Sequence, residues 1–290
     1  LIPKIKKTIL IDSLESNRYC SLFNISNKNN LSFFQIDLSK KKSLDKFKDA
    51  DYLIHLASMT NAEKSFGKEK EMYKNNLDCM NNTVDFCKKN KIKLIHLSST
   101  SVYGKQAELV DETCAKKYLK PQSPYAKIKL IEEKLLKSNR NKLKYMSFRF
   151  GTIAGVSKGM RFHTAINKFC FNASLNQKIH VYKTAYNQYR PYLSLKDAFK
   201  VFKFCIEKNI YKNEVYNALS GNFTVKQIIK MIQKYKKRTG IKFVNTAIMN
   251  QLSYHVDNNK LNNLGLKLNA KIEQDIKETL KIFIFKNNEM

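Results

Sequence analysis

Two side chains four residues apart are suited to acid–base chemistry. Tyr125 and Lys129 lie in residues 125–138, where apolar residues recur at three-and-four spacing and predict a helix. Residues four apart project from the same helix face. A lysine ammonium beside a phenol favours the phenolate, so Tyr125 could exchange a proton with a substrate hydroxyl near neutral pH. The pair alone is a weak signal, because a lysine-rich chain contains several such pairs by chance.

A run of hydroxyl side chains precedes this pair. The segment SSTSVYG (98–104) directly follows an apolar, β-type run, KLIHLSS. Ligands of parallel sheets bind at the carboxyl ends of the strands, so one of these hydroxyls could donate to the same substrate oxygen. The alternative is a Ser/Thr-rich turn that only caps the strand.

A carboxylate, Asp12, ends the first predicted strand. In doubly wound nucleotide-binding folds an acid at this place binds a ribose, and a glycine-rich turn precedes it by about 20 residues. Only eleven residues precede Asp12 here, and none is glycine. Either the fold is a different one, with Asp12 an ordinary turn residue, or the motif lies outside this sequence.

The elements that must position these residues follow from short β-branched runs that alternate with helical patterns. This alternation predicts βαβ units and a parallel sheet. A smaller second domain is expected after residue 150, giving domains 1–150 and 151–290, with segments near 190–210 returning to the first. The predicted strands are 8–12, 52–57, 93–98, 145–150 and 213–219, and the predicted helices are 63–90, 125–138, 160–175 and 224–237, the last with Thr224 as its N-cap.

Several ordered segments resemble the extended short-chain dehydrogenases, the NAD-dependent epimerase/dehydratase family that acts on nucleotide sugars. The resemblance covers nearly the whole chain. It implies an enzyme with a Rossmann-like, doubly wound parallel sheet and a smaller α/β substrate domain. The segments are DADYLIHLAS (49–58), YKNNLD (73–78), SSTSVYG (98–104), SPYAKIKLIEEK (123–134), FRFGTIAG (148–155), RPYLSLKDA (190–198) and EVYNALSG (214–221).

The resemblance implies a catalytic triad of Ser99, Tyr125 and Lys129 with NAD as cofactor. Tyr125 would remove a proton from a sugar hydroxyl, and Lys129 would hold the nicotinamide ribose. Asp12 has no arginine directly after it, which favours NAD over NADP. The further cofactor-binding positions that it implies are Asp12 and Ser13 at the adenosine ribose, Asp37 and Leu38 beside adenine, and Leu56, Ala57, Ser58 and Asn76 along the cofactor.

The residues after Ser99 bear on the type of reaction. The resemblance implies that dehydratases of the family have an Asp-Glu pair, which eliminates water, at the two positions after this serine. This chain has Thr100 and Ser101 there. The small-hydroxyl pattern is similar to UDP-glucose 4-epimerases, so a nucleotide-sugar epimerase is predicted. The alternatives are another dehydratase or reductase of the family and a non-catalytic, polyanion-binding relative.

Two departures from the family pattern concern cofactor and substrate. No glycine-rich loop is present, so we expect a chain that lacks the family's first strand, phosphate turn and first helix. Ser99, Thr100, Thr152 and Arg190 match substrate-binding positions. The family often has asparagine at the position of Thr152, which leaves the nucleotide sugar open, whereas the guanidinium of Arg190 suits a diphosphate.

The net charge of the 290-residue chain is +30, with 54 Lys+Arg against 24 Asp+Glu. The lysines are spread along the whole chain and only six of the basic residues are arginine, so a solvated cationic surface is predicted rather than a nucleic-acid site. No apolar run approaches the 18 or so residues that span a bilayer, and no leader opens the chain. A cytoplasmic protein without a membrane partner is expected.

The six cysteines are scattered without metal-ligand spacing, so reduced thiols and no metal site are predicted. His55 and His96 lie inside predicted strands and are expected to be satisfied core residues. The family resemblance also implies a homodimer, through the helices near 63–90 and 124–138.

Overall fold

The computed structural model describes residues 5–23, 25, 30–60, 67–106, 109–245 and 254–283. The chain divides into two compact units. The first contains Leu1–Val102, Pro121–Arg149 and Val201–Tyr216, and the second contains Tyr103–Lys120, Phe150–Lys200 and Asn217–Met290. Each unit has its own core.

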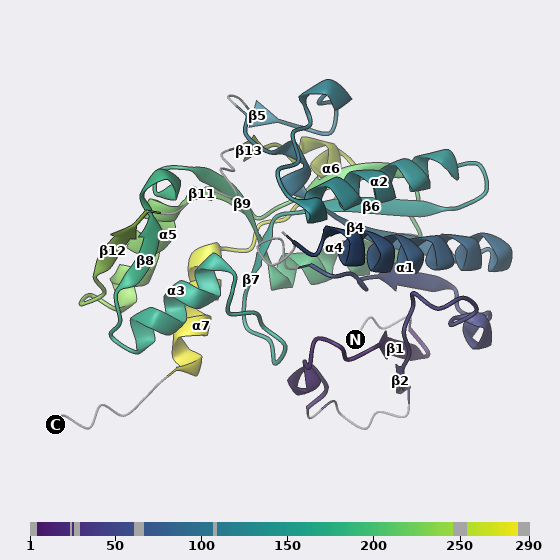
Figure 1. The fold of residues 1–290 in the computed structure, drawn as a ribbon, viewed down its shortest axis with the longest axis horizontal. Helices are drawn as coiled ribbons and strands as arrows, with labels where there is room; N and C mark the ends of the chain where they lie inside the picture. Colours follow the sequence, from purple (N-terminus) through teal and green to yellow (C-terminus); the bar gives the residue numbers. More distant parts are fainter. Residues whose placement is uncertain are drawn as a thin grey trace. The chain divides into compact units, whose positions relative to one another are not determined.

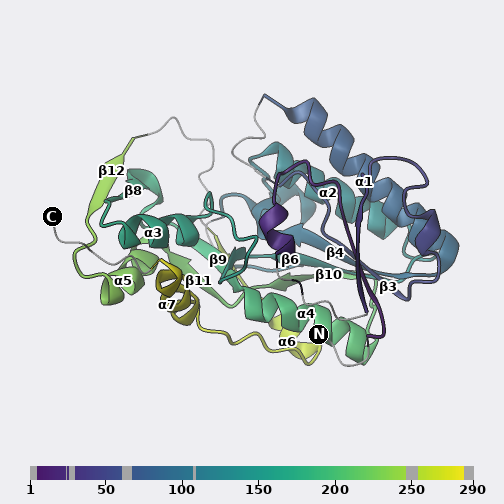
Figure 2. The same ribbon diagram turned by 90° about the horizontal axis from the view of Figure 1, so that it is seen from below.

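The first unit is built on a four-stranded sheet in the order β10-β6-β4-β3. Figure 2 labels its four strands. β3 runs parallel to β4, with His55 opposite His96. A separate parallel pair, β1 with β2, has Asp12 opposite Gln35. Among the described strands, β3 pairs only with β4, and β1 only with β2. The bounds are β1 Thr8–Asp12, β2 Leu31–Gln35, β3 Tyr52–His55, β4 Lys93–Ser99, β6 Tyr145–Phe150 and β10 Glu214–Ala218.

Helices α1 (Glu69–Asn90) and α2 (Pro124–Ser138) lie side by side in the first unit (Figures 1 and 2). α2 begins where Ser123 accepts a hydrogen bond from the Ala126 amide at 3.2 Å, with proline in the first turn, where its missing N–H costs nothing. Both helices bury apolar residues in one cluster, which includes Met80, Val84, Leu94, Leu136 and Tyr145. Burial against the sheet therefore fixes the face of α2 that carries Tyr125 and Lys129.

The second unit has a three-stranded sheet in the order β11-β9-β7 and two further strand pairs, β12 with β8 and β13 with β5. α4 (Leu195–Lys208) begins in this unit and ends in the first. The strand bounds are β5 Leu109–Val110, β7 Thr152–Ala154, β8 Ile179–Tyr182, β9 Tyr189–Ser194, β11 Gly221–Thr224, β12 Ile241–Val244 and β13 His255–Val256, and the helix bounds are α3 Ala165–Ser174, α5 Val225–Tyr235, α6 Asn259–Asn263 and α7 Ile272–Ile282.

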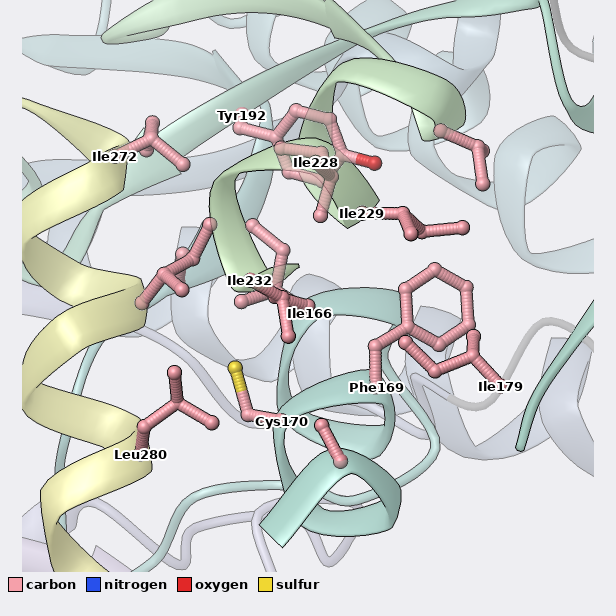
Figure 3. Packing of buried hydrophobic residues seen from close by; sticks show 14 of the residues in the cluster. Ile166, Phe169, Cys170, Ile179, Tyr192, Ile228, Ile229, Ile232, Ile272 and Leu280 are labelled. Atoms are coloured by element: carbon pink, nitrogen blue, oxygen red, sulfur yellow. The ribbon is translucent and has the colours of Figure 1, made fainter. Parts of the chain in front are cut away.

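Three helices pack their apolar faces together to form the core of the second unit. Figure 3 shows isoleucines of α5 pointing toward Cys170 and Phe169 of α3 and toward α7. Thr224 caps α5 in a capping box with Gln227, as its sequence position predicted.

Two predicted helices begin later than expected. The predicted helix 63–90 forms α1 from Glu69 onward, and its residues 63–66 lie outside the described residues. The segment 160–175 forms α3 only from Ala165 to Ser174. The Arg161 carbonyl accepts hydrogen bonds from the Thr164 hydroxyl and the Asn167 amide, which hold residues 161–164 as a turn. Side-chain hydrogen bonds to this backbone carbonyl therefore delay the start of α3 until Ala165.

A buried carboxylate on α7 predicts a pH effect on stability. Asp275 is 2% exposed, and its Oδ2 has no hydrogen-bond partner among the described residues. Burial raises the pKa of Asp275 to about 6. Its charged form therefore opposes folding, so the contribution of Asp275 to stability is most favourable below about pH 4 and is lost as the pH rises through 6. We expect Asp275→Asn to be more stable than the wild type by about 1–2 kcal/mol at pH 8 and by much less at pH 4, as measured by urea unfolding.

The matched control is Asp197→Asn. Asp197 accepts hydrogen bonds from Ser220 and from the Ala270 amide, and Lys200 lies 2.9 Å away. Replacement of this hydrogen-bonded, ion-paired carboxylate should destabilise the protein, in contrast to Asp275→Asn. An Asp275→Asn variant whose advantage is the same at both pH values would contradict the explanation.

Candidate active site

The predicted acid–base pair lies on α2 in the first unit. The Lys129 ammonium is 5.6 Å from the centre of the Tyr125 ring. Lys129 is 3% exposed, whereas Tyr125 is half-buried. The Tyr125 phenol is therefore accessible to a ligand. The buried Lys129 ammonium lies close enough to favour the charged form of that phenol.

A carboxylate and an imidazole surround the lysine. Glu132 Oε2 accepts a hydrogen bond from Lys129 Nζ at 2.8 Å and lies 2.8 Å from His96 Nε2. Burial opposes the charge on Lys129, yet the Glu132 carboxylate raises the pKa of the ammonium above its ordinary value. Burial would likewise raise the pKa of Glu132, but Lys129 and His96 hold it below its ordinary value. Lys129 and Glu132 therefore form a charged pair inside the unit.

A second buried ion pair, between Glu133 and Arg149, connects α2 to the sheet. Arg149 on β6 donates to both carboxylate oxygens of Glu133, at 2.9 and 2.7 Å, and Ser98 at the end of β4 donates to the same carboxylate at 2.5 Å. The forked geometry makes this contact strong and directional. It ties α2 to two strands only four residues from Lys129.

The hydroxyl segment follows β4. Ser99 is half-buried, and its Oγ accepts hydrogen bonds from the Ser101 hydroxyl at 2.8 Å and the Ser101 amide at 3.2 Å. Thr100 is 3% exposed. The segment is therefore a structured turn at the carboxyl end of a central strand, and α2, which carries Tyr125 and Lys129, packs against that strand.

Two carboxylates stand at the ends of the neighbouring strands β1 and β2. Asp12 is exposed, with Oδ1 bonded to the Leu14 amide at 2.7 Å, and Ser13 follows it. Burial opposes the charge on Asp37, but hydrogen bonds from Ser39 bring its pKa below the ordinary value. The exposed Asp12 carboxylate is able to accept hydrogen bonds from a ligand's hydroxyl groups, and the half-buried Asp37 is held in place by Ser39.

The backbone beside these carboxylates is held from α1. Asn82 donates to the carbonyls of Leu38 and Ser39 at 2.9 and 3.0 Å. This contact fixes the segment that carries Asp37 and Leu38, so an apolar side chain and a carboxylate occupy fixed places next to one another.

The turn after β3 presents an apolar surface. Leu56 is 58% exposed, and Ala57 and Ser58 are half-buried. Asn76 on α1 is fully buried and clamps Met59, accepting from its amide at 2.7 Å and donating to its carbonyl at 3.1 Å. Asn76 therefore holds the backbone of this turn in place, and Leu56 is its most exposed apolar side chain.

Thr152 and Arg190 lie in the second unit on adjacent parallel strands. Thr152 on β7 is opposite Tyr192 on β9, two residues along from Arg190. The structure thus places these two predicted substrate residues on neighbouring strands. The predicted triad and the cofactor-binding positions lie in the first unit. Among the described residues, no cluster of His, Cys, Asp and Glu could hold a metal ion, and no helix is long and apolar enough to cross a membrane.

Sequence reasoning missed Glu132 and His96. His96 was expected to be a satisfied core residue, and both of its ring nitrogens do have partners, Glu132 and Ser147. His55 has only Thr83 as partner at Nδ1, and its Nε2 has none among the described residues. The available signal was the spacing of Glu132, three residues after Lys129, but it was equally typical of a solvated helix face.

The parallel strands, the helices beside them and the Tyr125–Lys129 pair are typical of α/β enzymes that bind a nucleotide cofactor. The sequence profile of the NAD dependent epimerase/dehydratase family matches residues 8–218, so the chain belongs to this family of enzymes, whose cofactor is NAD.

Relatives in this family act on nucleotide sugars. A trifunctional UDP-glucose 4,6-dehydratase/UDP-4-keto-6-deoxy-D-glucose 3,5-epimerase/UDP-4-keto-L-rhamnose-reductase of Arabidopsis thaliana is 26% identical over 293 residues, 94% of this chain and 42% of that protein. The dTDP-D-glucose 4,6-dehydratase of Homo sapiens is 25% identical over 94% of this chain and 81% of that protein. The chain thus spans less than half the length of the plant relative.

Solved structures share the fold. A UDP-N-acetylglucosamine 4-epimerase from Methanobrevibacter ruminantium superposes with a TM-score of 0.80 at 23% identity, covering 96% of this chain and 98% of that one. A dTDP-glucose 4,6-dehydratase from Streptomyces venezuelae with NAD bound gives 0.84 at 17% identity, covering 96% and 88%. The Rossmann-like α/β fold is therefore confirmed, and both epimerases and dehydratases use it.

Proposed function

We propose that this protein is an NAD-dependent nucleotide-sugar 4-epimerase in which Tyr125 is the acid–base residue. The observation that carries the proposal is the turn after β4, where the Ser101 hydroxyl donates to Ser99 and Thr100 is buried. Elimination of water needs an acid and a base beside the substrate, and these positions have hydroxyl groups in place of carboxylates.

Tyr125 and Ser99 act on one substrate oxygen in this proposal. Tyr125, as phenolate, accepts the proton of the sugar hydroxyl, and the Ser99 hydroxyl donates a hydrogen bond to the same oxygen. NAD, when bound, supplies a hydride acceptor that is regenerated within one turnover, so no external oxidant is consumed. Lys129 keeps its positive charge next to the phenol and donates hydrogen bonds to the nicotinamide ribose.

The remaining positions bind the cofactor and substrate. Asp12 and Ser13 take the adenosine ribose, Asp37 and Leu38 flank adenine, and Leu56 with Ala57 and Ser58 lines the cofactor. Asn76 acts through the backbone of Met59. In the second unit, Arg190 meets the diphosphate of the nucleotide sugar, and Thr152 donates one hydrogen bond to it. Thr100 was predicted to bind substrate, but its side chain is buried, so the proposal assigns the substrate contact of this turn to Ser99.

The experiment is a product analysis with UDP-glucose, UDP-N-acetylglucosamine, UDP-glucuronate and dTDP-glucose, after bound NAD is quantified by mass spectrometry and absorbance. It is made on the purified protein. A 4-epimerase gives a product of unchanged mass with the inverted hydroxyl. A product that has lost the mass of water contradicts the epimerase proposal and supports the second candidate, a 4,6-dehydratase like the human relative.

Two further proposals concern partners. The family resemblance supports a homodimer through α1 and α2, which equilibrium sedimentation tests. A polyanion-binding role without catalysis predicts steeply salt-dependent binding of nucleic acid together with absence of turnover on every nucleotide sugar.

A further inference from the structure

Below Tyr125, a chain of hydrogen bonds runs from α2 to the sheet. Lys129 Nζ contacts Glu132 Oε2, the same oxygen contacts His96 Nε2, and His96 Nδ1 contacts Ser147 Oγ, at 2.8, 2.8 and 2.9 Å. Lys129 is 3% exposed, and the other three residues are 0% exposed. Glu132, His96 and Ser147 therefore reach no solvent, and Lys129 almost none.

The charges in this chain follow from its burial. Burial lowers the pKa of His96, so the imidazole is neutral near pH 7. A neutral His96 donates from Nε2 to the Glu132 carboxylate and accepts at Nδ1 from the Ser147 hydroxyl. The cluster thus contains one positive charge, one negative charge and one oriented imidazole.

The other ionisable groups around the cluster do not replace Glu132. His55 on β3 is neutral, because burial lowers its pKa to about 3. Glu133 on α2 is engaged by Arg149 on β6. Glu132 is therefore the carboxylate that balances Lys129, and an isolated ammonium at this depth would lose its proton more readily.

We propose that Glu132, oriented by His96 and Ser147, is a positioning residue that clamps Lys129, holding its ammonium charged and fixed in place beside Tyr125. The inference rests on the proposed function only in that Tyr125 is taken as the acid–base residue. The hydrogen bond to Glu132 uses one of the three ammonium hydrogens of Lys129 and leaves two for other acceptors. The Glu132 carboxylate offsets the free-energy cost of burying the Lys129 charge.

The first test reads Lys129 directly and requires neither NAD nor substrate. A buried, ion-paired ammonium exchanges its protons slowly, so a ¹H–¹⁵N spectrum at pH 7 should contain one protected lysine ammonium signal, which Lys129→Arg removes and thereby assigns. Glu132→Gln should also remove that signal, and Glu132→Asp should retain it. Persistence of the signal in Glu132→Gln would overturn the clamp.

The second test reads the consequence for Tyr125. In Glu132→Gln, we expect the acid limb of the kcat profile to move up by about one pH unit, and kcat at pH 7 to fall by up to about 10-fold with little change in KM, because Tyr125 loses its positive neighbour. Ser147→Ala, which leaves every charge in place, should shift the limb in the same direction by less. A loss of kcat at all pH values with an unmoved limb indicates a merely structural role and overturns the proposal.

The two tests separate the clamp from the proposed function. If the wild type has no turnover that depends on Tyr125, the proposed function fails, and the ammonium signal still decides whether Glu132 holds Lys129. If Glu132→Gln does not fold, Glu132→Asp and Ser147→Ala carry the test: a lost ammonium signal in Glu132→Asp or an unchanged profile in Ser147→Ala contradicts the clamp.

Discussion

Replacement of Tyr125 by phenylalanine is expected to lower kcat by about 10²–10⁴-fold on the nucleotide sugar that the wild type converts, because a positioned acid–base residue contributes a factor of this size. The change removes one oxygen from a half-buried side chain and leaves the ring over Lys129 in place. The amount of bound NAD, KM and the unfolding midpoint should therefore change little. Steady-state kinetics with a mass-spectrometric product assay measures the effect.

The matched control for this prediction is Tyr118→Phe. Tyr118 is 52% exposed and lies outside the proposed site, so the same chemical change there should leave kcat unaltered. If Tyr125→Phe turns over as fast as Tyr118→Phe, Tyr125 is not the acid–base residue and the proposed mechanism is wrong.

Replacement of Glu133 by leucine is expected to destabilise the protein by about 3–5 kcal/mol, the largest effect on stability that the structure predicts. Arg149 is 5% exposed and would keep its charge without its forked partner. Ser98 would lose its acceptor as well. Urea unfolding followed by circular dichroism measures the change in the midpoint.

The double variant Glu133→Leu with Arg149→Met provides the decisive comparison. Replacing both members of a buried pair by apolar groups is often nearly neutral, so the double variant should recover most of the loss. Asp85→Ala, which breaks the exposed pair with Lys88, should change stability by less than about 0.5 kcal/mol. If the double variant is as unstable as the single one, the cost comes from lost packing and not from the loss of the Glu133 carboxylate beside the charge of Arg149.

The parts of this fold with strong local signals were predictable. Strands 8–12 and 145–150 match β1 and β6, and the 224–237 helix was placed by its Thr224 cap. Alternation of apolar residues and caps acts within a few residues, so the sequence contains it directly. The late start of α3 depended on side-chain bonds to the Arg161 carbonyl, which no periodicity reveals.

The candidate site likewise has one part that the sequence predicts and another that depends on tertiary packing. The grouping of Tyr125 with Lys129 follows from helical spacing, and the structure confirms that they share a face of α2. The meeting of Glu132 with His96 joins residues 36 positions apart and depends on how α2 packs on β4. A glutamate in a lysine-rich helix is ordinarily solvated. The burial of Glu132 therefore could not be predicted without the packing of α2 on the sheet.

The free edges of β1 and β3 have a consequence for how copies of the chain behave together. In the described part of the chain, each of these strands has a ladder partner on one side only. An open edge offers unpaired backbone donors and acceptors to a strand of another molecule. The net charge of +30 opposes such encounters. Salt shortens the range of that repulsion to about 10 Å at 0.1 M, so colloidal stability in this protein is an electrostatic property that decreases as ionic strength rises.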